Sequence, residues 1–222
     1  MANFLDKVQP KNKAQLKSLI DHAFKNNIYN LNFIDKSKIT NMSNLFMNCE
    51  YDIDVSNWDV SNVTTTFCMF VGCKKFNSDL SNWDVSNVKN MNNMFYCCKN
   101  FDCDLSNWNV SNVTDMYSMF TACESFEGKG LDNWDVSKAE DMRFMFYNCK
   151  NFNCDLSNWD MSKALRINEM FYGCKNFEGK GLENWKLEKT LFYYDIFTGC
   201  DKVKLPSWYK AFLKRCNLEF FK

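Results

Sequence analysis

The sequence predicts an α/β repeat solenoid in which each rung contains one short strand and one short helix, with a helical cap at both ends. Three observations support this class. Tryptophan recurs at a nearly constant interval, phenylalanine and cysteine recur in step with it, and each interval holds two different apolar patterns. The tryptophans are Trp58, Trp83, Trp108, Trp134, Trp159 and Trp185, at steps of 25 or 26 residues.

The first expected element is a helix from Asn12 to Phe24. Asn12 is placed to cap the first turn with Gln15 three residues later, and Leu16 and Ile20 fall on one apolar face. Residues 1–33 are therefore predicted to be an N-terminal capping helix and lead-in.

Each repeat then divides into two halves. The segment from Phe76 to Trp83 is too short for a helix and predicts a brief strand with a corner. Apolar residues in the segment 88–95 are spaced i, i+3, i+6 and i+7, which is typical of a short helix, and Ser86 precedes them as an N-cap. This unit falls within the length range of leucine-rich repeats. We therefore predict a leucine-rich-repeat-like solenoid of about seven rungs over residues 34–200.

A second capping helix is expected at the C-terminal end. Pro206 suits a helix start, and Trp208, Phe212 and Leu213 could cover the last rung. Residues 201–222 are predicted to form this cap. Both predicted ends carry more basic than acidic residues, and the repeats between them have an acidic excess.

Overall charge argues against two classes of partner. The chain has 27 basic and 27 acidic residues, whereas a nucleic-acid binder needs a basic excess on one face. Its apolar runs are shorter than the roughly 18–20 residues of a membrane-spanning helix, so we expect no membrane insertion. The first residues lack a basic segment followed by an apolar one, which favours a cytoplasmic location. The alternative is a cell-surface or secreted protein whose signal was removed or whose export is non-classical.

The 12 cysteines are the strongest hint of chemistry. Stacked rungs would bring ladder cysteines about 5 Å apart at the backbone, close enough for disulfides, although reduced thiols are the default inside cells. We interpret these cysteines as small apolar core residues. The ladder comprises Cys49, Cys73, Cys98, Cys123, Cys149, Cys174 and Cys200.

Other features also argue against an enzyme. The sequence contains no C-x-x-C motif and a single histidine, His22, so we expect no metal, no cofactor and no catalytic residues. Asp79, Asp104 and Asp155 recur once per repeat and are better explained as turn-formers than as a catalytic pair. The tryptophans are interpreted as core residues; their alternative is an exposed stacking platform.

The repeat motif resembles a known family. Residues 79–88 read D-L-S-N-W-D-V-S-N-V and are followed by Met91 and the pair Met94-Phe95. This motif, together with the lead-in at residues 10–16, resembles the BspA-like leucine-rich-repeat surface proteins of bacteria. The resemblance implies a right-handed repeat solenoid and, in many members, a role at the cell surface or in adhesion. It implies no catalytic residues.

The leading functional prediction is a non-enzymatic scaffold for protein–protein interaction. A basic protein surface would complement a solvent-facing strip of acidic and amide side chains. One alternative is a self-associating structural or adhesive surface protein, forming a homo-oligomer. A minor alternative is a thiol-dependent enzyme. The predicted partner-binding strip, named the acidic strip below, comprises Asn77, Asp79, Asp102, Asp104, Glu127, Asn153, Asp155 and Glu178.

Overall fold

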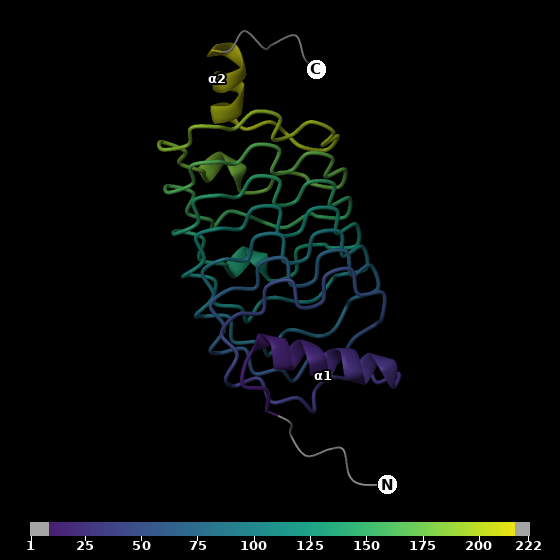
Figure 1. Cartoon of the computed structure of the whole chain (residues 1–222). Coiled ribbons are helices and arrows are strands. Elements are labelled where there is room, and N and C mark those ends of the chain that lie inside the picture. The colour runs from purple at the N-terminus through teal and green to yellow at the C-terminus, as the bar shows by residue number, and fades with distance from the viewer. Residues whose placement is uncertain (1–8, 216–222) are drawn as a thin grey trace.

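A computed structural model describes residues 9–215 of the chain (Figure 1). This part contains two α-helices, α1 (Lys13–Lys25) and α2 (Ser207–Arg215), and two short 3-10 segments, η1 (Leu131–Asn133) and η2 (Leu182–Asn184). The outer ends of the two predicted caps, including Cys216, lie outside the described residues. Neither described helix is long and apolar enough to cross a bilayer.

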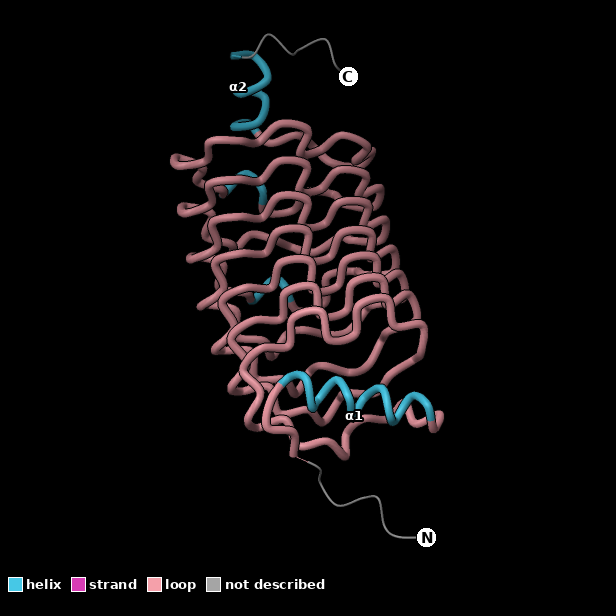
Figure 2. The backbone as a smooth tube through the Cα atoms, in the orientation of Figure 1, coloured by secondary structure: helices cyan, strands magenta, loops and turns pink. Residues whose placement is uncertain are grey.

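Successive repeats lie above one another in layers between the two α-helices (Figure 2). Neighbouring layers pair in parallel at a single bridge residue per repeat. Backbone amides of one layer then donate to carbonyls of the next at every second residue, as from Met91, Asn93 and Phe95. The main column of bridge residues is Asn41, Thr65, Asn90, Asp115, Asp141, Arg166 and Phe192.

Each layer is built from β-turns. In the layer that starts at Asn90, the amide of the fourth residue of each turn donates to the carbonyl of the first. The first and fourth residues are all buried, so each turn directs its two ends into the core. The turns of this layer are Met91–Met94, Phe95–Cys98, Cys98–Phe101, Leu105–Trp108 and Val110–Val113.

The predicted α/β fold class is therefore wrong. Within residues 9–215 the repeats form no sheet and no α-helix, so they are not a leucine-rich-repeat-like solenoid of strand–helix rungs. The i, i+3 spacing that predicted a helix over 88–95 arises because both ends of a β-turn face the core. Asn93 and Cys97, at the third positions of two consecutive turns, have φ values of 55° and 60°, which a right-handed helix excludes. The predicted strand over 76–83 contains a turn from Leu80 to Trp83 and has no strand ladder.

The core consists of aromatic columns that run through the layers. Phe95 stacks on Phe120 of the next layer with ring centroids 5.6 Å apart and an interplanar angle of 9°. Trp108 is 4% exposed, and its indole nitrogen donates to the Leu80 carbonyl of the preceding layer at 2.9 Å. This arrangement satisfies the polar edge of the indole while its rings are buried. The six repeat tryptophans are 2–4% exposed, so they do not form an exposed stacking platform.

The two α-helices occur in segments for which the sequence predicts helices. In α1, Asn12 accepts a hydrogen bond from the Gln15 amide at 3.0 Å, and Leu16 and Ile20 are fully buried. In α2, Trp208 stacks on Trp185 at 6.3 Å and donates to the Leu182 carbonyl at 2.8 Å. Trp208 thus continues the tryptophan column into the helix.

Candidate functional surfaces

The acidic strip is a pair of columns on the outside of the layers. Most of its members are exposed, and Asp102 and Asp155 are half-buried. One column contains Asn77, Asp102, Glu127, Asn153 and Glu178, and the other contains Asp79, Asp104 and Asp155. The structure thus brings the predicted residues together by column.

Much of the hydrogen-bonding capacity of the strip is used within the fold. The amide of Asp102 donates to Asn77 Oδ1 at 2.9 Å, and the amide of Glu127 donates to Asp102 Oδ1 at 3.0 Å. In the second column, Asp104 Oδ1 accepts from the Ser106 amide at 2.9 Å, the arrangement of an Asx turn. Asp79 and Asp155 make the same contact to the serine two residues on. This confirms that these aspartates form turns.

Two lysines outside the predicted strip neutralise part of it. Lys129 Nζ lies 2.6 Å from Asp102 Oδ2, and Lys180 Nζ lies 2.6 Å from Asp155 Oδ2. The hydrogen bond from Lys180 lowers the pKa of Asp155 to about 2. Both lysines belong to the repeated Glu-Gly-Lys-Gly-Leu segment, so their periodic placement beside the strip was the signal that could have found them.

A shallow open hollow of about 460 Å³ adjoins the strip. Glu127 and Asn153 line it together with Asn151, Asn176 and Lys202. Asn176 donates to Asn151 Oδ1 at 3.3 Å, and Lys202 donates to Asn176 Oδ1 at 2.9 Å, so the lining groups already bond one another. Among the described residues, no three histidine, cysteine or acidic side chains are grouped as metal ligands, here or elsewhere.

A second surface, named the aromatic face below, lies on the outside of the consecutive turns. Its side chains leave the layers at the central positions of the turns, which vary from repeat to repeat. Tyr147 stacks on Tyr172 at 4.8 Å, and Phe144 makes edge contacts with Tyr117 at 5.6 Å and with Tyr147 at 6.0 Å. The residues of the aromatic face are Phe67, Tyr96, Tyr117, Phe144, Tyr147 and Tyr172, all exposed or half-buried.

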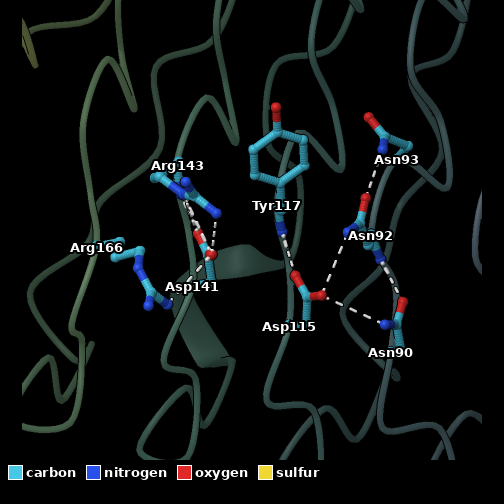
Figure 3. A network of polar contacts seen from close by, with 8 residues as sticks. All are labelled: Asn90, Asn92, Asn93, Asp115, Tyr117, Asp141, Arg143 and Arg166. Atoms are coloured by element: carbon cyan, nitrogen blue, oxygen red, sulfur yellow. Dashed lines mark hydrogen bonds and ion pairs between the residues drawn. The ribbon is translucent and has the colours of Figure 1, made fainter.

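A polar network supports the aromatic face (Figure 3). Asp141 Oδ2 lies 2.6 Å from one Arg143 nitrogen and 3.7 Å from Arg166, and the Arg143 guanidinium lies 5.0 Å from the Tyr117 ring centroid. The hydrogen bond to Asp141 raises the pKa of Arg143 above its usual value.

One layer away in this network, Asp115 Oδ2 accepts from the side-chain amides of Asn90 and Asn92, each at 3.3 Å. Asp115 Oδ1 also accepts from the Tyr117 backbone amide at 3.0 Å, so Asp115 fixes the turn that carries Tyr117 while Arg143 contacts the Tyr117 ring.

The ladder cysteines are buried, except Cys200, which is half-buried, and their thiols contact backbone carbonyls. Cys123 Sγ lies 3.0 Å from the Phe95 carbonyl and Cys149 Sγ lies 2.9 Å from the Phe120 carbonyl. Burial raises the pKa of both thiols far above the usual range, which disfavours the nucleophilic thiolate. None of the described cysteines forms a disulfide.

The fold and these surfaces define a repeat protein whose layers are stacked turns. The chain matches the model of a family described as "Mycoplasma protein of unknown function, DUF285" over residues 14–129 and 98–209. These two overlapping matches span most of the chain, which therefore belongs to this family. No curated protein matches the chain.

Proposed function

We propose that this protein is a non-enzymatic scaffold for protein–protein interaction and that the aromatic face is its principal binding surface. The observation that carries the proposal is the concentration of tyrosine and phenylalanine at solvent-facing turn positions. Tyr96 is 38% exposed and Phe67 is 37% exposed, whereas the residues at the two ends of their turns, Phe95 and Cys98 and Thr66 and Met69, are buried. Tyrosine and arginine are enriched at the energetic centres of protein interfaces.

Preorganisation also favours this use of the face. Tyr117 and Tyr147 are fixed by ring contacts, and the Asp141–Arg143 pair holds the guanidinium against Tyr117. Side chains that are ordered before association lose less conformational entropy on binding. By contrast, the acidic strip is partly neutralised by its own lysines, so we assign it a secondary role with a basic partner.

The experiment compares proteins captured by three matched baits. We expect the wild-type chain to retain a specific protein that the Phe67→Asp/Tyr96→Asp variant does not retain. The control is Lys163→Asp, an exposed change away from the aromatic face, which should behave as wild type. Equal capture by all three baits would contradict the assignment of the aromatic face.

A second candidate function is adhesion at a cell surface, as the resemblance of the repeated D-L-S-N-W-D-V-S-N-V motif to BspA-like surface proteins implies. Antibody labelling of source cells, intact or permeabilised, distinguishes a role at the cell surface from a role inside the cell. Labelling without permeabilisation supports adhesion, and labelling only after permeabilisation contradicts it.

A further inference from the structure

The two edges of the repeat stack differ in the backbone groups they present. In each internal layer, amides at alternate residues donate to the next layer, as from Ile167, Glu169, Phe171 and Gly173 to the last layer. The corresponding amides of the last layer belong to Tyr193, Asp195, Phe197 and Gly199. None of these four has an acceptor among residues 9–215. The last layer therefore ends in a row of hydrogen-bond donors.

The carbonyl that precedes this row is also without a donor in the described part of the chain. The Leu165 carbonyl accepts from the Leu191 amide of the last layer, and the equivalent carbonyl in the last layer is that of Leu191. Helix α2 lies over only part of the edge (Figure 1). Tyr209 packs on Phe197 with ring centroids 5.0 Å apart, and the ring centroids of Phe212 and Tyr193 are 4.2 Å apart.

Apolar side chains are exposed at the same edge. Leu191 is 67% exposed, Phe192 50% and Tyr194 48%, which are the three highest values among the large apolar residues that the structure describes. All three lie within four positions of the last layer. An exposed apolar patch next to unpaired backbone groups is typical of an edge that pairs with another chain.

Basic residues outnumber acidic residues around this edge, although Asp195 lies within it and Glu188 and Asp201 flank it. Lys189 precedes the patch, and Lys210 and Lys214 lie on α2. None of the three forms an ion pair within the described residues. Backbone amides add partial positive charge of the same sign.

We propose that the edge from Leu191 to Gly199 binds an extended acidic segment of another protein. The backbone carbonyls of that segment would accept from the Tyr193 and Asp195 amides, in the manner of a strand added to an open edge. Its apolar side chains would cover Phe192 and Tyr194, and its carboxylates would face the lysines of α2. Tyr194 lies in the same column as Tyr117, three layers further on, but the site uses none of the residues of the aromatic face and does not depend on the function proposed for that face.

The test uses a fluorescent decapeptide of alternating glutamate and valine, with an alternating lysine and valine peptide as its matched control. We expect saturable binding of the glutamate peptide in fluorescence anisotropy, at least about tenfold tighter than the lysine peptide. Binding should slow hydrogen exchange at the Tyr193 and Asp195 amides. Equal binding of the two peptides, or binding that leaves these amides unprotected, would overturn the proposal.

Substitutions in the chain test where the glutamate peptide binds. Phe192→Asp/Tyr194→Asp should lower affinity for the glutamate peptide at least about tenfold, whereas Asn107→Asp, at an exposed position outside both surfaces, should leave it unchanged. If the edge variant misfolds in circular dichroism, Lys210→Glu/Lys214→Glu tests the same site from α2 and should weaken binding several-fold. Unchanged affinity in the folded edge variants contradicts the proposal, whatever the aromatic face binds.

Discussion

At certain glycines, the backbones of neighbouring layers approach more closely than a side chain would allow. Gly130 has φ of 85°, and a Cβ at this residue would lie 2.2 Å from the Ser106 amide nitrogen. Gly199 has a similar φ of 75°, but a Cβ there would meet its nearest atom at 3.3 Å, in Gly173. The two glycines share a backbone conformation and differ in the space available, so they form a matched pair.

Gly130→Ala should therefore destabilise the protein more than Gly199→Ala. Both substitutions bear the cost of a left-handed alanine, about 1–2 kcal/mol. Gly130→Ala should cost about 1–3 kcal/mol more, because the backbone of the preceding layer must move. Urea unfolding of the two variants measures the difference. Equal free energies of unfolding would contradict the close approach of these layers.

The burial of the ladder thiols leads to a second prediction about single residues. Cys123, Cys149 and Cys174 are fully buried, and burial raises the pKa of each thiol, so alkylation at pH 8 should be very slow in the native protein. Among the cysteines that the structure describes, the two half-buried ones, Cys97 and Cys200, should react before these three. Mass spectrometry after iodoacetamide treatment measures the order. Rapid native modification of Cys123, Cys149 or Cys174 would instead support the thiol-dependent enzyme.

Consecutive β-turns are the element from which this protein is made, and they explain what the sequence could and could not reveal. The repeat period, the buried tryptophans and the segments of both α-helices follow from apolar spacing and capping residues. The turn structure could not be predicted in this way, because a helix and turns with buried ends share the same i, i+3 apolar spacing. Asparagine at positions such as Asn44, Asn48 and Asn93 was the available signal, since it tolerates positive φ.

The candidate surfaces were predictable to different degrees. The acidic strip recurs in several repeats, so its columns could be found by alignment of the units. Tyr96 and Tyr147 occupy positions that hold threonine or valine in other repeats, at Thr121 and Val71. A consensus hides such variable positions, and the aromatic face emerges only when the layers are superposed in space.

Ion pairs between layers should make stability depend on acid pH. Glu124 lies between Lys99 at 2.8 Å and Lys150 at 2.6 Å, and hydrogen bonds from these lysines lower its pKa to about 2. Because the pKa is lower in the folded state, the contribution is present above the unfolded value, about pH 4, and is lost as the pH falls toward 2.

Glu124→Gln should therefore reduce the loss of the free energy of unfolding between pH 4 and pH 2. These side chains are substantially exposed, so 0.5 M salt should weaken the effect in the wild type. Glu188→Gln, at an exposed glutamate without an ion pair among the described residues, is the control. Identical pH profiles for wild type and Glu124→Gln would contradict this account.

At the scale of the whole molecule, the layers behave as units that contact only their neighbours. Residues 95–145 and 146–196 are two copies of one two-repeat block. Deleting residues 95–145 joins Met94 to Phe146 and keeps every column in register. Since the stability of stacked repeats depends on neighbour contacts, the shortened chain should fold cooperatively with a lower free energy of unfolding.

The matched control for this deletion removes residues 95–133, which joins Met94 to Trp134 and breaks the columns. Thermal unfolding followed by tryptophan fluorescence compares the two. The in-register deletion should show a cooperative transition, and the control should not. A folded control would mean that column register is not what holds the layers together.

The central claim is that the outer surface of the turn layers, at the aromatic face, contacts a protein partner. Site-specific photo-cross-linking in source cells tests it most directly, with a benzophenone amino acid at Tyr96 and, as the control, at Asn107 on the outside of another turn. The account predicts a discrete protein adduct from position 96 and none from position 107. No adduct from position 96, or the same adduct from both positions, would contradict it.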